Sequence, residues 1–305
     1  MYLRGIAVFL GLAYGLGFAL LYGGLNLGLL SFTNGSIQHT LLMVVLFNLP
    51  AVFAFIAGQV GSGPTLTRVF PLPRIAVLRV IVLIPVVFVL VNFIGVLVGA
   101  NLLDWRLGTL TNVLMQGRDP LPAEQAAILP AIFLVAGPLI TILLGATLVA
   151  ACALGHVYAW HAYLQDRLAP LGRLRAAVLG GVLWALWFAP FIFFALQSAQ
   201  TFQRENIGSK LFFFPIGGLL VAIGLTAILR HAYEKSRGLA LPAVILGSVL
   251  ANAVGGLSIW EYLFQAQDLR LAGFFGVISA VVWCALGVYP ALLVGAKVDV
   301  PEETA

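Results

Sequence analysis

Apolar residues form long, nearly uninterrupted runs along this sequence and do not alternate with polar ones. Eight runs can be marked, at residues 5–30, 41–60, 75–100, 126–163, 174–198, 211–230, 240–258 and 271–294. An α-helix needs about 20 apolar residues to cross a bilayer, whereas the strands of a membrane β-barrel alternate in polarity over about 10 residues. The pattern therefore predicts an all-α fold, a polytopic membrane helix bundle with about eight transmembrane helices.

Composition agrees with this prediction. Of 305 residues, 62% are hydrophobic and 9% are charged, against roughly 45–50% and 25% in soluble domains, so a water-soluble globule is excluded. The net charge of +5 is scattered, and no cluster of four or more bases occurs, so we expect no nucleic-acid partner. Both cysteines, Cys152 and Cys284, lie in apolar runs, so we predict no disulfide framework.

The runs predict one membrane domain over residues 1–305. Residues 1–124 hold the first three spans and a connection, residues 125–295 hold spans four to eight as a core, and residues 296–305 form a tail. The first run exceeds the 7–15 residues, roughly, of a signal-peptide core, so we expect a retained span. The fourth run is too long for a perpendicular helix, so it tilts or projects beyond the lipid.

The distribution of bases predicts how the spans face. One side collects eleven bases and the other five. Because cytoplasmic loops are enriched in Lys and Arg, we expect both termini in the cytoplasm and the protein in the inner (plasma) membrane. The eleven are Arg4, Arg68, Arg74, Arg79, Arg167, Arg173, Arg175, Arg230, Lys235, Arg237 and Lys297, and the five are Arg106, Arg118, Arg204, Lys210 and Arg270.

Polar residues within the apolar runs are few and mostly uncharged. All eleven Asp and Glu residues fall outside the runs, in connections or the tail, which disfavours a proton-coupled carrier because such proteins keep an ionisable group near the midplane. Gly11 and Gly15 have a spacing that lets helices approach closely, either inside the bundle or at a subunit interface. The polar residues inside runs are Asn48, Gln59, Asn92, Ser248 and Asn252, which we expect mainly to tie helices together.

Two histidines, His156 and His161, lie at the end of the fourth run. Five residues apart, they would point about 140° apart around a regular helix. Zinc sites take three or four ligands, so we expect no metal site here and no cofactor. The neighbouring Tyr158, Trp160 and Tyr163 indicate a polar, aromatic segment near the lipid headgroups.

Two segments of the sequence resemble the motifs of a known protein family. The first is HVYAWHAYL from His156 to Leu164, followed by Arg167-Leu168, and the second is LWALWFAP from Leu183 to Pro190. Together they resemble the CAAX-processing and bacteriocin-processing (CPBP) family of intramembrane proteases, which includes the type II CAAX prenyl endopeptidases. That family carries Glu-Glu-x-x-x-Arg at the end of a long span, an aromatic-x-x-x-His motif in the next span, and His-x-x-x-Asn in a later one. The resemblance covers residues 125–295.

Matched residue by residue, the family's catalytic set is mostly replaced. His156 and Val157 stand at the two glutamates, and His161 stands at the arginine. Phe188 stands at the second-motif histidine, and Trp184 keeps the aromatic place. Ser248 stands where the family has a metal-binding histidine, and only Asn252 is retained.

The resemblance implies a cytoplasm-facing chamber with an apolar, aromatic lining of Val157, Trp160, Trp184, Phe188, Ser248 and Asn252. If it is open, it suits a lipid tail, an isoprenoid, a pigment or a partner's transmembrane helix. If bulky side chains fill it, the fold is a packed bundle.

Three functions follow as hypotheses. The first is a catalytically inactive CPBP-type membrane protein that acts as a scaffold or accessory subunit for a membrane-protein partner or lipid-like ligand. The second is an intramembrane endopeptidase with altered chemistry, using His156 or His161 as base. The third is a small-molecule membrane carrier.

Overall fold

The computed structural model describes residues 2–30, 37–61, 74–98, 139–198, 214–263 and 276–293, together with the isolated positions 124, 128 and 136. Within these ranges the chain is helical apart from short turns, and no strand occurs there. The predicted all-α class is thereby confirmed. The tail at 296–305 and nearly all of the connection before residue 125 lie outside the described residues.

Two helical rods combine α-helical and π-helical segments. The first rod consists of α1 (Tyr2–Leu10), η1 (Gly11–Gly17) and α2 (Phe18–Asn26). The fourth-run rod contains the π-helical η2 (Gly145–Val149), α7 (Ala150–Val157), the π-helical η3 (Tyr158–Tyr163), α8 (Leu164–Leu168) and a final 3-10 turn, η4 (Ala169–Leu171). The other helices are α3 (Ile37–Val60), α4 (Arg74–Val98), α9 (Arg173–Ser198), α11 (Phe214–Ser236), α12 (Ala240–Leu263) and α13 (Val277–Leu293).

Five helices in the described ranges are long and apolar enough to cross a membrane: Leu3–Asn26, Leu41–Val60, Leu139–Leu171, Arg173–Phe191 and Pro215–Ser236. Three shorter apolar helices, Ile75–Val91, Ala240–Ala253 and Val277–Gly287, lie at the other predicted spans. Large apolar side chains such as Val45, Val52 and Phe55 face outward, as suits a lipid-facing surface. These features fit an integral membrane protein, and the structure supports five of the eight expected spans.

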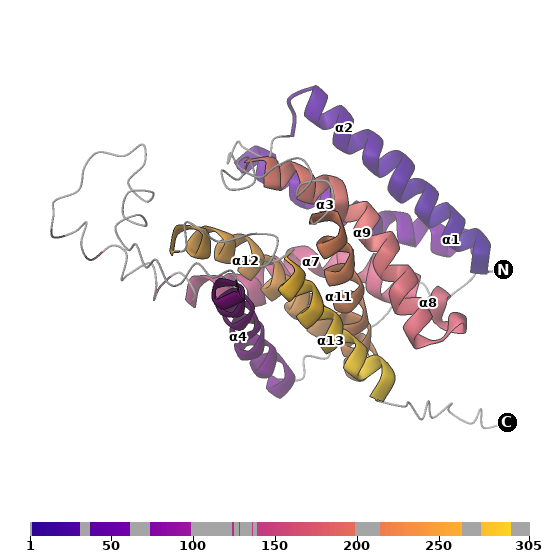
Figure 1. Cartoon of the computed structure of the whole chain (residues 1–305). Coiled ribbons are helices and arrows are strands. Elements are labelled where there is room, and N and C mark those ends of the chain that lie inside the picture. Colours follow the sequence, from indigo (N-terminus) through magenta and orange to yellow (C-terminus); the bar gives the residue numbers. More distant parts are fainter. Residues whose placement is uncertain are drawn as a thin grey trace.

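The helices pack as a bundle with the first rod at one edge and α4 at the opposite edge (Figure 1). Helix α11 packs against α9 and α13, and α12 packs against α4, α7 and η2. On the other side, α1 packs against α3, and α3 packs against α7. The fourth-run rod therefore contacts both α3 and α12.

Glycines allow some helices to cross closely. A Cβ added at Gly287 on α13 would lie 2.9 Å from the Cα of Gly224 on α11. Gly11 and Gly15 differ, since a Cβ at either would meet nothing within 4 Å among the described residues. Gly28, two residues after the end of the first rod, has a φ of +69°, which glycine adopts without strain. Internal packing of the Gly11 and Gly15 face is therefore not seen in the described part of the chain.

Three helices continue beyond the predicted ends of their runs. The fourth-run rod continues beyond residue 163 to Leu171, α11 beyond residue 230 to Ser236, and α12 beyond residue 258 to Leu263. Asp166, Glu234 and Glu261 therefore lie in helices and not in connections. The helices can carry the charges of Asp166 and Glu234 because both carboxylates form ion pairs with Arg230.

Candidate functional site

The segment that resembles the CPBP motif forms the π-helical turn η3 and the last residues of α7. In a π-helix, N–H groups bond to carbonyls five residues back, and such turns are frequent at functional sites. The turn brings His156 and His161 against one side chain, Trp184 on α9, with ring centroids 6.0 and 4.8 Å from the indole. The expectation that the two histidines point far apart is therefore wrong, because it assumed a regular α-helix.

His156 is fully buried and has a hydrogen-bond partner at each ring nitrogen. Its Nδ1 lies 3.0 Å from the carbonyl oxygen of Phe47 on α3, and the indole Nε1 of Trp184 donates to its Nε2 at 2.6 Å. Because an indole N–H can only donate, Nε2 accepts, and Nδ1 carries the hydrogen that is donated to Phe47. The imidazole is therefore neutral and in a defined tautomer.

Aromatic side chains enclose this imidazole. Phe47 stacks on it with a centroid distance of 4.0 Å and an interplanar angle of 8°. Phe188 lies edge-on at 5.9 Å, and Trp160 lies tilted at 6.4 Å. We call these residues, with Trp184, the His156 cluster. Three residues of the expected lining, Trp160, Trp184 and Phe188, therefore lie around the ring of His156, which is fully buried.

His161 has a different environment. It too is fully buried, and neither ring nitrogen has a hydrogen-bond partner among the described residues. Its ring lies edge-on to Trp184, with an interplanar angle of 81°. Its neighbour on the motif, Val157, is buried and apolar. His161 is therefore the one histidine of the motif whose ring nitrogens are not already used by this fold.

The other two motif positions, Ser248 and Asn252, lie at a different level of the bundle. A Cβ added at Gly145 would be 2.9 Å from the Cα of Ser248, and Gly145 precedes His156 by eleven residues, or about three helical turns. Asn252 donates to the carbonyl of Ser248 in its own helix at 2.8 Å. The structure thus brings together His156, His161 and Phe188, and places Ser248 elsewhere.

Asn48 ties two helices together, as was expected of polar residues within the spans. Its Nδ2 donates to the carbonyl of Cys152 on α7 at 2.6 Å and to Val44 in its own helix at 2.9 Å. This side chain therefore ties α3 to α7, one turn before His156.

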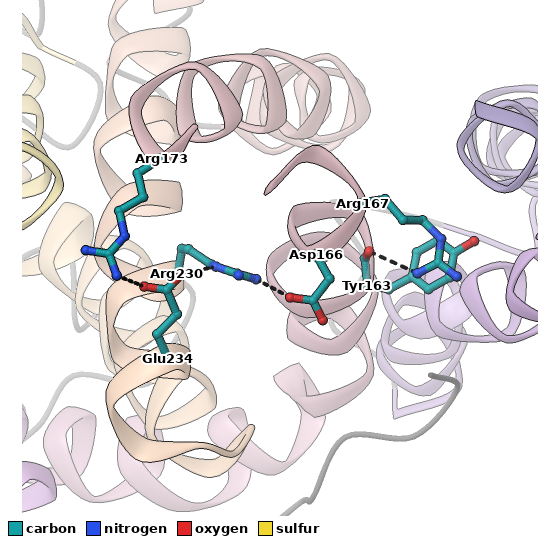
Figure 2. A network of polar contacts seen from close by, with 6 residues as sticks. All are labelled: Tyr163, Asp166, Arg167, Arg173, Arg230 and Glu234. Atoms are coloured by element: carbon teal, nitrogen blue, oxygen red, sulfur yellow. Dashed lines mark hydrogen bonds and ion pairs between the residues drawn. The ribbon is translucent and has the colours of Figure 1, made fainter. Parts of the chain in front are cut away.

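A second polar group, the charged cluster, lies at the end of the same rod (Figure 2). Arg230 on α11 pairs with Asp166 on α8 at 2.5 Å and with Glu234 one turn later at 2.7 Å. Glu234 also pairs with Arg173, at the start of α9, at 2.9 Å. In the sequence these bases indicate only topology, but the i,i+4 spacing of Arg230 and Glu234 is a signal for an ion pair within one helix.

Metal ligands do not group in the part of the chain that the structure describes. No three His, Cys, Asp or Glu side chains there lie together in a way that could hold an ion. Within the His156 cluster, the one side chain of a metal-binding type is His156, and neither of its ring nitrogens has a free lone pair in this arrangement.

The chain matches no protein-family model, no curated protein and no solved structure. The resemblance to the CPBP family therefore rests on the two quoted segments, Ser248 and Asn252.

Proposed function

We propose that this protein is a catalytically inactive, CPBP-like integral membrane protein that serves as a scaffold or accessory subunit for another membrane protein. The observation that carries the proposal is the state of His156, which stands at the position matching a family glutamate. Both of its ring nitrogens are used in hydrogen bonds to Phe47 and Trp184.

The chemistry of those bonds argues against catalysis at His156. A general base must reach the proton it removes with a free lone pair. The lone pair of His156 Nε2 is directed at the indole N–H of Trp184, and using it for water would leave that buried donor without a partner. Val157 and Phe188 can neither accept a proton nor bind a metal ion.

One observation favours the second hypothesis, an endopeptidase with altered chemistry. His161 is buried and its ring nitrogens lack partners among the described residues, so it is the better candidate for a base. If it were one, His161→Ala would abolish a measurable peptide hydrolysis by the purified protein. Hydrolysis that is absent, or unchanged by the substitution, eliminates this hypothesis.

We also propose that all eight apolar helices cross the inner (plasma) membrane, with both termini in the cytoplasm. The support is that predicted cytoplasmic segments meet at one end of the bundle. Gly5, beside Arg4, lies against Arg167 and against Ala57 near the end of α3. The start of α9 is joined to the end of α11 by the Arg173–Glu234 ion pair.

A protein partner is favoured over an isoprenoid-like ligand in this core, because the His156 cluster is filled by side chains. The candidate contact is the outer face of the first rod at Gly11 and Gly15. Both glycines are exposed, and a Cβ added at either would meet no described atom within 4 Å outside its own stretch of helix. Small residues on such a face let a second transmembrane helix approach closely.

Copurification from native membranes tests the proposal. The tagged protein, expressed at its native level, should carry one defined membrane protein in fixed stoichiometry. The double variant Gly11→Leu, Gly15→Leu should lose this partner, whereas Val52→Trp, which adds bulk to an exposed position on α3, should keep it. A wild-type protein recovered alone, or a partner retained by the glycine variant, would contradict the proposal.

A further inference from the structure

Arg167 on α8 is a buried cation that has no carboxylate partner among the described residues. Its side chain is 6% exposed, and its guanidinium lies 3.6 Å above the ring centroid of Tyr163 (Figure 2). Nη1 makes one long hydrogen bond, 3.4 Å, to the carbonyl oxygen of Tyr163. Nε and Nη2 are buried and have no hydrogen-bond partner among the described residues.

The acidic side chains of the neighbouring charged cluster already form ion pairs with other arginines. Asp166, the adjacent residue, pairs with Arg230, and Glu234 pairs with Arg230 and Arg173. Figure 2 shows Arg167 on the opposite side of α8 from Asp166 and directed away from the charged cluster. Arg167 is therefore not a member of that cluster, although it is its neighbour in sequence.

The first rod closes over this guanidinium. A Cβ added at Gly5 would lie 3.3 Å from Nε of Arg167 and 3.1 Å from the hydroxyl of Tyr163. The Tyr163 hydroxyl donates to the carbonyl of Gly5 at 3.4 Å. Arg4, next to Gly5, is exposed and adds a second positive charge at this end of the rod. Arg167 thus lies between two helices, beside a base on the surface.

Burial of an unpaired guanidinium is unfavourable, because the lost hydration is not replaced by an opposite charge. The planar, forked N–H groups of arginine match the oxygens of a phosphoryl group. Basic pockets between transmembrane helices at the cytoplasmic side bind anionic headgroups. In the topology proposed above, Arg167 lies at that level.

We propose that Arg167, with the exposed Arg4 next in sequence to the glycine that lies against it, binds a phosphoryl group, carried by an anionic lipid headgroup or by free phosphate. The proposal does not depend on the scaffold function, because it rests on Arg167 and not on the His156 cluster. The two sources of the phosphoryl group are distinguished by the experiment.

The test is native mass spectrometry of the purified full-length protein titrated with dioleoylphosphatidylglycerol, with dioleoylphosphatidylcholine as the zwitterionic control lipid. The wild type should bind one phosphatidylglycerol in preference to phosphatidylcholine. Arg167→Gln should weaken this binding at least about fivefold. Arg167→Lys keeps the positive charge but removes the forked N–H groups of the guanidinium, and it should also bind phosphatidylglycerol more weakly. This second variant keeps the test decisive if Arg167→Gln does not fold.

Arg175→Gln is the matched control, since Arg175 is exposed on α9, and it should bind like the wild type. Added inorganic phosphate separates the two sources. If inorganic phosphate at millimolar concentration displaces phosphatidylglycerol, the site recognises the phosphoryl group alone. If phosphate does not displace phosphatidylglycerol, the site recognises the lipid headgroup. Equal binding of the two lipids without phosphate competition, or Arg167 variants that bind like the wild type, would overturn the proposal.

Discussion

At the scale of single residues, His156 acts as a structural group. Its two hydrogen bonds join α3 and α9 to α7, and its ring stacks on Phe47. A buried polar side chain costs stability unless its hydrogen bonds are made, and here both are made. His156 is thereby a point of contact between three helices.

The hydrogen bond from Trp184 to His156 can be tested by substitution. Trp184→Phe removes the indole N–H and leaves His156 Nε2 without a donor, so we expect a loss of about 1–3 kcal/mol in the free energy of unfolding. Thermal or denaturant unfolding in detergent measures it.

Trp187→Phe is the control for this prediction. Trp187 lies on the same helix and is fully buried, but its indole N–H has no described partner. The two variants lose the same ring volume, so the Trp184 variant should be the less stable one. Equal losses would mean that the Trp184–His156 hydrogen bond contributes nothing.

At the scale of helices, the charged cluster joins the ends of α8, α9 and α11. Arg230→Gln removes both ion pairs of this arginine and leaves Asp166 and Glu234 close together. Because these side chains are partly exposed, we expect a moderate loss of about 1–2 kcal/mol in unfolding free energy. Arg175→Gln should change it by less than about 0.5 kcal/mol, and an equal effect of the two variants would contradict the role of the cluster.

Helix crossings provide a second prediction at this scale. A Cβ at Gly224 would collide with the backbone of α13 at Trp283, so Gly224→Ala should cost about 1–3 kcal/mol of unfolding free energy. Gly15→Ala, on the uncovered face of the first rod, should cost nothing, since alanine is the better helix former. Thermal unfolding of the two variants side by side decides this, and equal stability would count against the close crossing.

Apolar runs predicted the existence and order of the helices, because each membrane span needs a continuous apolar stretch. They misplaced three ends, because charged residues were taken to mark connections. Two of these residues, Asp166 and Glu234, are accommodated in helices by their ion pairs with Arg230. The relation of His156 to His161 could not be read from the sequence. It depends on the π-helical turn η3, and on α9 placing Trp184 beside both rings.

At the scale of the whole molecule, we propose that the end carrying the charged cluster faces the cytoplasm. Single cysteines in a Cys152→Ala, Cys284→Ser background test this proposal. Leu27→Cys, at the far end of the first rod, should react with a membrane-impermeant maleimide in sealed cells. Leu171→Cys, at the turn before α9, should react only after permeabilisation; both positions are exposed. The reverse pattern would contradict the orientation.

We propose that the segment which resembles the protease motif binds no metal ion, because both ring nitrogens of His156 are used in hydrogen bonds and His161 is the one remaining histidine there. Zinc content of the purified protein, measured by inductively coupled plasma mass spectrometry after dialysis against zinc and then buffer, tests this most directly. We expect far less than one zinc per chain, and the same zinc content in the wild type and in His156→Ala. One zinc per chain in the wild type that is lost in His156→Ala would contradict it.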